Sequence, residues 1–377
     1  MATALQCGRA SKKSERSTSS TAPATRCSPR PRWRFRRSIR GALNNKTDVG
    51  KPFPNIRTTL LDTRLLKNEW NQTFVGATSA FNLNNPRATL RLDPEGIRVG
   101  VLGTLLISDE YGPYMFEFGP NGRLLRRLDV PDSYAILNPS ADPNAELLGN
   151  AAGRQANRGM EGLAITPDDR YLFGQMQNAL IQDGGLATGT TTRVGVNGRI
   201  LKLDLVTGKT REYVYRVDTI GGGQGVSEIV AVNNHEFLVV ERDNRSWLAA
   251  APSQPQSKKI YKVDVNGASD VSNVAALPAG ALPADVTPVK KDLLIDLLYP
   301  EFGLNQRDAN AIAEKIEGLA WGEDLADGRH VLYVFSDNDL NRSLDTQVFA
   351  FAIDPALIDF VPQFRFLPLY PRGRLPR

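Results

Sequence analysis

A glutamate motif that leads into an apolar run occurs four times along the chain. Three copies have the form Glu-Gly followed by apolar residues, and one weaker copy lacks the glycine. The copies are centred on Glu95, Glu161, Glu228 and Glu317. The first three glutamates are separated by 66 and 67 residues, and the fourth follows 89 residues later. Such repetition is typical of a domain built from several copies of one supersecondary unit.

The residues that follow each motif also repeat. A second apolar run ends in acidic or amide residues, as at 171–178, and a third run alternates apolar and polar residues, as at 199–204. Three of the third runs lead into turn-forming pairs at Asn121-Gly122, Thr207-Gly208 and Asn266-Gly267. Alternation of this kind indicates strands. A unit of a few strands cannot bury both of its faces alone, so the copies must stack, which predicts an all-β β-propeller.

The charge distribution bears on the class of partner. The whole chain carries +5; because residues 1–40 carry +10 and residues 363–377 carry +4, the part between them carries −9. An acidic body argues against a nucleic-acid surface and is compatible with cation binding. No apolar run approaches the length of a membrane span. We therefore expect a small-molecule substrate, no nucleic acid, no transmembrane segment and a monomer.

The first forty residues are rich in Ser, Thr, Pro and Arg and lack hydrophobic periodicity. Three interpretations remain: an organellar transit segment, a disordered basic tail, or a start that is not the natural one. A secretory signal is not expected, because no apolar core follows the positive residues. Both cysteines, Cys7 and Cys27, lie here, so the rest of the chain has neither a disulfide nor a thiolate metal site.

The domain boundaries follow from these patterns. We expect a propeller domain over residues 41–362, followed by a basic tail over 363–377. Strand-like runs at 58–62 and 88–92 suggest part of an additional blade upstream of Glu95. Two insertions interrupt the repeats. The first, 131–157, has the composition of a long loop, and the second, 275–315, is expected to contain helical segments at 292–298 and 305–316.

The repeated glutamates carry the predicted chemistry. The inner strands of a propeller line a central channel, so an acid at the same place in several blades becomes a ring. Carboxylates that converge repel one another unless a cation joins them or some are protonated. Carboxylate, amide and carbonyl oxygens are the ligands of Ca²⁺. The predicted cation ligands are Glu95, Asp109, Glu110, Glu161, Gln177, Asn178, Glu228, Glu241, Glu317, Asp337, Asn338 and Asp339.

Other interpretations of the same residues compete with this one. A repeated Glu-Gly can accept backbone hydrogen bonds in a turn, where the glycine supplies an unusual φ angle. The two histidines, His235 and His330, each precede a strand-like run and suit turn positions better than catalysis. The Gly-x-Ser-x-Gly motif of an α/β-hydrolase is absent from the sequence.

A larger set of motifs carries a family resemblance. The set consists of Asp-Pro-Glu-Gly-Ile (93–97), Ile-Ser-Asp-Glu-Tyr-Gly-Pro (107–113), Asn-Arg-Gly-Met-Glu-Gly-Leu-Ala (157–164), Glu-Arg-Asp (241–243) and Lys-Ile-Glu-Gly-Leu-Ala-Trp (315–321). Together they resemble the phytase-like β-propeller family described as having esterase-like activity. The resemblance covers roughly residues 41–353. It implies a six-bladed propeller that is incomplete at the N-terminus of this chain, with helical or loop insertions.

The resemblance also implies a function. It suggests divalent-cation-dependent hydrolysis of an ester or phosphoester at an acidic mouth, with Ca²⁺ as the expected ion. Glu161, Glu228 and Glu317 are then the predicted catalytic residues, and Arg158 and Arg242 would orient an anionic substrate. Members of the family are often secreted or periplasmic. Residues 317–321 also resemble the opening motif of gluconolactonase-like propellers, so a metal-dependent lactonase and a non-catalytic binding module remain alternatives.

Overall fold

A computed structural model describes residues 63–363 of the 377-residue protein, apart from 78–79, 81, 83, 86–89, 113, 219–223, 309, 340 and 342. The basic segment 1–40, the strand-like run 58–62 and all but the first residue of the basic tail lie outside the described residues.

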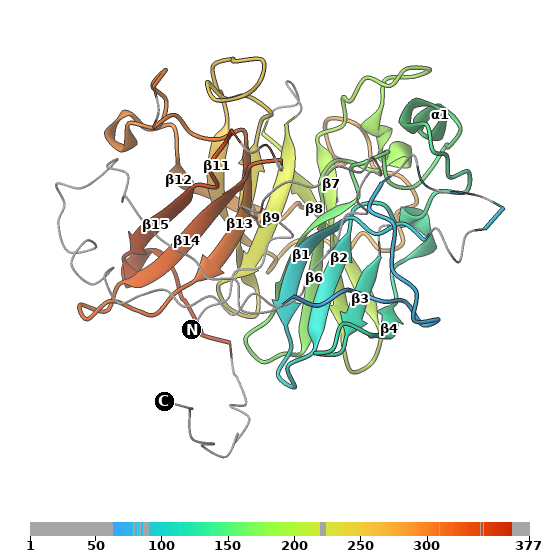
Figure 1. Cartoon of the computed structure of the whole chain (residues 1–377), viewed down its shortest axis with the longest axis horizontal. Coiled ribbons are helices and arrows are strands. Elements are labelled where there is room, and N and C mark those ends of the chain that lie inside the picture. The colour runs from blue at the N-terminus through green and yellow to red at the C-terminus, as the bar shows by residue number, and fades with distance from the viewer. Residues whose placement is uncertain are drawn as a thin grey trace, which may run out of the picture.

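Four antiparallel sheets follow one another along the chain (Figure 1). The first sheet contains β1 (Pro94–Val99), β2 (Leu105–Asp109), β3 (Met115–Phe118) and β4 (Leu124–Leu128). The second contains β5 (Met160–Ile165), β6 (Tyr171–Met176), β7 (Asn197–Asp204) and β8 (Thr210–Arg216). The third contains β9 (Gly225–Ala231), β10 (Glu236–Arg242), β11 (Lys258–Asp264) and β12 (Lys290–Asp296). The fourth contains β13 (Lys315–Trp321), β14 (His330–Asp337) and β15 (Val348–Ile353).

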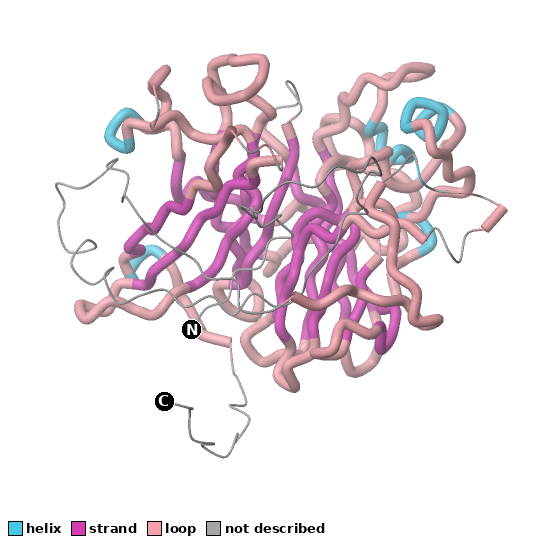
Figure 2. The backbone as a smooth tube through the Cα atoms, in the orientation of Figure 1, coloured by secondary structure: helices cyan, strands magenta, loops and turns pink. Residues whose placement is uncertain are grey.

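The helical structure is confined to short segments at the periphery (Figure 2). One α-helix, α1 (Pro143–Leu148), lies in the first insertion, with Asp142 as its N-cap. The remaining helical turns are η4 (Asp132–Tyr134), η5 (Ile181–Gly185), η6 (Pro300–Phe302) and η7 (Pro355–Leu357). The described residues contain no helix long and apolar enough to cross a membrane.

The first strand of each sheet packs against the first strand of the next, in the series β1, β5, β9 and β13. Two glycines permit this close approach. A Cβ at Gly96 would lie 2.5 Å from Leu163 Cβ, and one at Gly162 would lie 2.8 Å from Ile229 N. Sheets of meandering antiparallel strands arranged with their first strands together are the blades of a β-propeller. The predicted all-β propeller is therefore confirmed.

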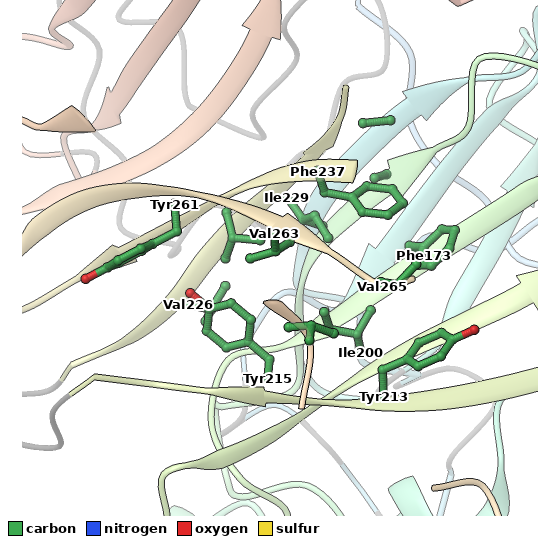
Figure 3. Close-up of a cluster of buried hydrophobic side chains, with 14 of the residues drawn as sticks. Phe173, Ile200, Tyr213, Tyr215, Val226, Ile229, Phe237, Tyr261, Val263 and Val265 are labelled. Carbon is green, nitrogen blue, oxygen red and sulfur yellow. The ribbon is translucent and has the colours of Figure 1, made fainter. Parts of the chain in front are cut away.

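The hydrophobic core lies between consecutive blades. Phe173 of the second blade and Phe237 of the third have ring centroids 4.4 Å apart, within a buried cluster that also contains Ile200, Tyr215 and Ile229 (Figure 3). Similar clusters separate the first blade from the second and the third from the fourth. The facing sides of consecutive sheets are therefore buried against each other, as repeat stacking requires.

The described residues form four blades, so six blades are not supported. The segment before β1 does not form a separate sheet in its described part. Lys67 is bridged to Arg123 beside β4, and Leu66, Phe74 and Leu92 join the apolar cluster of the first blade. This segment therefore covers the first blade instead of starting another one.

The predicted helix at 292–298 is wrong, because residues 290–296 form strand β12, which pairs with β11. The run Leu293-Leu294-Ile295 is short and apolar, and such a run fits a strand as well as a helix. The predicted helix at 305–316 is also wrong: its described residues are turns and extended chain that lead into β13. The first insertion, 131–157, is a long loop with one short helix.

The topology gives the propeller two distinct faces. The glutamate motifs begin the first strands, and the acidic and amide residues end the second strands, which run antiparallel to them. Both sets therefore lie on one face. On the opposite face, Val361 N donates to Val232 O at 2.8 Å, and Gln363 Nε2 donates to Val99 O at 3.0 Å.

Candidate functional site

A β-bulge at the start of each first strand turns a side chain out of the ladder. In the second blade, Met160 pairs with Met176 and Gly162 with Gln175, which leaves Glu161 as the extra residue. In the fourth blade, Glu317 is the extra residue between Ile316 and Gly318. In the first blade, the irregularity spans Glu95 and Gly96. Bulges re-aim side chains, and are frequent beside active sites for that reason.

The bulge of the third blade carries a different residue. Val226 pairs with Glu241 and Glu228 with Val240, so Ser227 is the extra residue. Ser227, and not Glu228, is therefore the structural equivalent of Glu161, and Glu228 stands where the second blade has Gly162. A slip of one residue moves a side chain to the other face of a strand.

Glu228 is consequently held between blades. Its carboxylate is buried and accepts hydrogen bonds from Ile229 N at 2.8 Å and, more weakly, from Leu163 N at 3.4 Å. Arg98 Nη2 lies 3.0 Å from the same oxygen, Oε1. Burial raises the pKa of Glu228, while Arg98 acts in the opposite direction. The structure does not bring Glu228 to the other motif glutamates, because these contacts tie its carboxylate to the first and second blades.

Three carboxylates of the first blade converge on the motif face. Asp93, Glu95 and Glu110 each offer an oxygen atom within 4.8 Å of the other two. Burial raises the pKa of all three, and repulsion from Glu161 raises it further for Glu95 and Glu110. We call Asp93, Glu95 and Glu110 the acidic triad. Asp93 was missed in the sequence, although it begins the Asp-Pro-Glu-Gly motif that contains Glu95.

Glu161 and Glu317 lie beside the acidic triad, and a buried arginine links them. Arg242 Nη2 donates to Glu317 and lies 3.9 Å from Glu161 Oε1. Burial and repulsion from Glu317 raise the pKa of Glu161 to about 8, against the opposing charges of Arg242, Arg158 and Lys315. Arg242 is 2% exposed. It therefore serves as an internal counter-ion of the site, and not as an arm that reaches solvent.

The neighbourhood of Glu161 contains buried oxygens that have no partner among the described residues. Gln177 Nε2 donates to Glu161 Oε1 at 2.8 Å, while Glu161 Oε2 and Gln177 Oε1 accept nothing. The Asn178 amide donates to Gln224 O, and its Oδ1 is likewise without a donor. Buried acceptors without donors are uncommon, and a bound cation or a water would satisfy them.

The end of β14 adds a further acid to this face. Burial and repulsion from Glu317 and Asp339 raise the pKa of Asp337 to about 6. Asp339 is exposed and lies 3.6 Å from Lys315 Nζ, and Asn338 Nδ2 donates to Leu344 O at 2.9 Å. Lys315 begins β13 and was not singled out from the sequence, although its charge opposes the raised pKa of both Glu110 and Glu161.

Two predicted ligands, Asp109 and Glu241, use their carboxylate oxygens for other hydrogen bonds. Asp109 is fully buried and accepts from three backbone amides, those of Asp93, Tyr111 and Gly112; burial raises its pKa to about 7. Glu241 accepts from the Tyr215 hydroxyl at 2.7 Å and from Lys291. The turn interpretation therefore describes Asp109 well. Of the four glutamates of the predicted ring, Glu95, Glu161 and Glu317 lie on the motif face together with Glu110, whereas Glu228 is held between blades.

The two histidines bear no relation to this site. His235 Nδ1 lies 2.9 Å from Asp264 Oδ1, and His330 Nδ1 lies 2.9 Å from Asp324 Oδ1. His330 also packs edge-on against Phe360, on the opposite face of the propeller. His235 occupies the turn position expected from the sequence, whereas His330 is the first residue of β14, where it pairs with Ile353.

The fold and the site define a β-propeller with a buried acidic centre at one face. The chain belongs to the phytase-like family described as "Esterase-like activity of phytase", whose model matches residues 43–340. The resemblance inferred from the motifs is thereby confirmed.

Individual proteins also match this chain. The chain is 28% identical over 363 residues to an uncharacterized secreted protein of Arthroderma benhamiae, covering 76% of this chain and 70% of that protein. Solved structures that match include the Cps50 (Swd1) β-propeller domain of Myceliophteria thermophila, with a TM-score of 0.29, 11% identity and coverage of 70% and 72%. The propeller of Dos1 matches with a TM-score of 0.25, 11% identity and coverage of 74% and 71%.

Proposed function

We propose that the protein is a divalent-cation-dependent hydrolase that acts on an ester or phosphoester at the acidic triad and Glu161. The observation that carries this proposal is the convergence of Asp93, Glu95 and Glu110 within 4.8 Å. Carboxylates at such distances repel one another unless a cation joins them or some are protonated, and the fold maintains this arrangement on a single blade. Membership of a hydrolase-like propeller family supports the same conclusion.

The donor atoms fit a hard cation, and Ca²⁺ is the proposed ion. Calcium takes about six to eight oxygen ligands at flexible geometry, and the triad supplies three carboxylates without sulfur or imidazole. Glu161 Oε2 and Gln177 Oε1 are further unpartnered oxygens in the adjoining blade. When bound, the ion would polarise the scissile bond and lower the pKa of a water molecule.

Glu161 is the proposed general acid–base residue. A group transfers protons most effectively when its pKa lies near the working pH, and in the cation-free protein the pKa of Glu161 is raised to about 8. A cation held by the acidic triad would lower this pKa, because an opposite charge favours the ionised carboxylate. Gln177 fixes one carboxylate oxygen by a hydrogen bond of 2.8 Å and leaves the other available. Glu317 itself raises the pKa of Glu161, and Arg242, which is paired with Glu317, would limit how far that pKa rises.

A calcium titration tests the cation site. We expect Ca²⁺ to raise the free energy of unfolding by about 2.7 kcal/mol when its concentration is one hundred times the dissociation constant. The paired variant Glu95→Gln/Glu110→Gln should abolish the increase. Glu117→Gln, on β3 of the same blade and paired with Arg126 at 2.7 Å, is the matched control and should retain it. A wild-type protein that ignores both calcium and chelator contradicts the proposed cation site.

Turnover assays with calcium then separate the reaction classes. We expect hydrolysis of p-nitrophenyl acetate or p-nitrophenyl phosphate and its loss in Glu161→Gln. Turnover of a simple lactone alone would favour the gluconolactonase-like alternative. Silence on all three substrates would contradict a hydrolase and favour a binding module.

The proposed compartment follows from the relative in Arthroderma benhamiae, which is described as a secreted protein. Extracellular calcium is abundant enough for sites of modest affinity. Secretion of this protein is therefore consistent with a calcium-dependent site, and cell fractionation with an antibody against the chain tests it.

A further inference from the structure

A tripeptide with the acceptor pattern for N-linked glycosylation lies in the segment that covers the first blade. Asn71-Gln72-Thr73 has the form Asn-x-Thr, and its middle residue is not proline. Such a tripeptide can receive an oligosaccharide when a chain passes through the secretory pathway, and it must lie on the surface because the sugar is bulky and hydrated. All three residues are exposed, so the folded chain meets this requirement.

A neighbouring asparagine holds the loop that presents Asn71. Asn68 is 1% exposed, and its Oδ1 accepts hydrogen bonds from Trp70 N at 3.0 Å and from Gln72 N at 2.9 Å. The backbone oxygen of Asn68 also accepts from Asn71 N at 3.0 Å. Side chains of asparagine commonly stabilise turns in this way. The two asparagines therefore differ in role, since Asn68 fixes the loop and Asn71 is presented to solvent.

The carboxamide of Asn71 is not used by the loop. Asn71 has a φ of 63°, in the left-handed region that asparagine tolerates better than most residues. Its side chain makes no hydrogen bond to any described residue. The preceding residue, Trp70, is 45% exposed, and a sugar ring that covered part of this indole would remove apolar surface from water. The loop therefore offers both a free acceptor nitrogen and a surface for the attached sugar.

The loop is attached to the first blade on the face opposite the acidic triad. Lys67 N donates to Gly122 O at 2.8 Å, and Leu124 N donates to Lys67 O at 2.9 Å. Gly122 lies in the turn between β3 and β4. In an antiparallel meander this turn lies at the other end of the sheet from the residues that begin β1. A glycan on Asn71 would therefore leave the acidic triad accessible.

Another acceptor tripeptide, Asn244-Arg245-Ser246, provides a contrast within the chain. Ser246 is fully buried, and its hydroxyl donates to Ile312 O at 2.6 Å. Asn244 is only partly exposed, and its Oδ1 accepts a hydrogen bond from Arg242, which is buried. A glycan on Asn244 would disrupt these contacts, so the folded protein is expected to carry none there.

The other two acceptor tripeptides do not support the same inference. The one at 45–47 lies outside the described residues. Asn341 of the one at 341–343 is exposed, but its Oδ1 accepts from Ser343 N at 3.0 Å and from the Ser343 hydroxyl at 2.6 Å. It also follows the end of β14, on the motif face. The inference is therefore restricted to Asn71.

We propose that Asn71 is a site of N-linked glycosylation. In this reaction, Nδ2 of Asn71 forms a bond to the anomeric carbon of an oligosaccharide, the bond between that carbon and a lipid-linked diphosphate breaks, and the amide nitrogen loses one proton. The inference rests on the proposed secretion, which brings the chain to the lipid-linked donor, and does not depend on the hydrolase activity. The glycan would add hydrated surface next to Trp70 and near β4, the edge strand of its sheet.

Secretion of the full chain from yeast, behind a signal peptide, tests the site. The secreted protein is treated with peptide-N-glycosidase, which releases the oligosaccharide and converts the asparagine that carried it to aspartate. We expect mass spectrometry to find this conversion at Asn71 in most molecules and not at Asn244. The tryptic peptide 68–87 contains no other acceptor tripeptide, which makes the assignment to Asn71 unambiguous.

Three variants control for the acceptor pattern. Asn71→Gln and Thr73→Ala should each lose the mass of one glycan, whereas Thr73→Ser keeps the pattern and should retain it. Thr73→Ala also guards against misfolding, because it leaves the residue with positive φ unchanged. Removal of the glycan should not alter the calcium-dependent rise in melting temperature, since the loop lies on the opposite face.

Secreted wild-type protein with an unmodified Asn71 overturns the inference, and so does sugar on Asn244 in place of Asn71. Retention of the native protein inside its own cells overturns both the proposed secretion and the glycan. The hydrolase is judged separately. An unmodified Asn71 in a protein that hydrolyses esters makes the glycan alone wrong, and a modified Asn71 in a protein without turnover makes the hydrolase alone wrong.

Discussion

The second and third blades use the same sequence position for opposite purposes. In the second blade, the bulged residue is Glu161, whose raised pKa and unpartnered oxygen suit it to chemistry. In the third blade, the bulged residue is Ser227, whose hydroxyl donates to Ile316 O at 2.6 Å and joins the third blade to the fourth. The neighbouring Glu228 braces three blades through Arg98 and the backbone of β5. The third blade thus has a contact between blades where the second blade has the proposed acid–base residue.

The difference follows from strand geometry. Successive side chains of a strand point to opposite faces, so Glu228 cannot point where Glu161 does if the bulge lies one residue earlier. Gly162 occupies the position of Glu228 in the second blade and packs against Glu228 and Ile229. The two positions are complementary, since the missing side chain of Gly162 leaves room for the backbone of the next blade.

Removal of the Glu228 carboxylate, which links three blades, should have the largest effect on the free energy of unfolding. Glu228→Gln leaves Arg98, whose side chain is 14% exposed, without its carboxylate, and breaking a buried pair in this way costs about 3–5 kcal/mol. We expect urea denaturation to report a loss of this size. The rise in stability caused by calcium should remain as large as in wild type, because Glu228 lies outside the acidic triad. A variant that keeps its stability but loses its response to calcium would reverse the assignment.

A smaller effect on stability is expected from a change of pH, which acts through Glu161 of the second blade. The pKa of Glu161 is raised to about 8 in the folded protein, so between its unfolded value near 4.5 and about 8 the folded state binds more protons than the unfolded state. The stability due to this group is therefore fully present at low pH and is lost as pH rises towards 8. The slope is at most about 1.4 kcal/mol per pH unit for one group.

Chemical denaturation of calcium-free protein between pH 5 and pH 8 measures this slope. Glu161→Gln, which mimics the protonated acid, should reduce the slope by up to this amount, while Glu95, Glu110 and Asp109, whose pKa values are also raised, keep a remaining slope. Calcium should restore stability at the upper end by favouring the ionised carboxylates. Asp204→Asn removes an acid whose pKa is lowered by Arg170, and should leave the slope above pH 5 unchanged. A curve that rises with pH in wild type would contradict the assigned protonation of the site.

The repeat in the sequence was sufficient to predict the propeller and the common face of Glu95, Glu161 and Glu317. Period-two alternation reports strands, and four copies require stacking, so neither inference depends on details of side-chain packing. The run at 292–298 was misassigned, because an apolar stretch of that length has no distinctive period. The blade count was not predictable, since it depends on how the ring is completed outside the repeats.

The composition of the site was predictable only in part. The copy at Glu228 lacked its glycine, which was the available sign that this strand holds a different register. Lys315 could not be chosen from the sequence, because its proximity to the acids depends on which end of β13 faces the centre. Arg242 was predicted to orient a substrate, whereas the structure shows it as a buried counter-ion of Glu317. Its burial could not be predicted, since it follows from the pairing with Glu317 across two blades.

The smallest effect is expected at the residue that replaces glutamate in the third blade. Ser227→Ala removes a buried hydrogen bond to Ile316 O and leaves that carbonyl without its hydroxyl donor, which costs about 1–2 kcal/mol. The response to calcium and the pH slope should both equal those of wild type, because a serine hydroxyl adds no charge to the site.

Ser227→Glu is the informative counterpart: a carboxylate at the bulge would lie at the position equivalent to Glu161 and Glu317. We expect it to destabilise calcium-free protein more at pH 8 than at pH 5, and equal destabilisation at both values would show that the bulge of the third blade does not face the acidic centre.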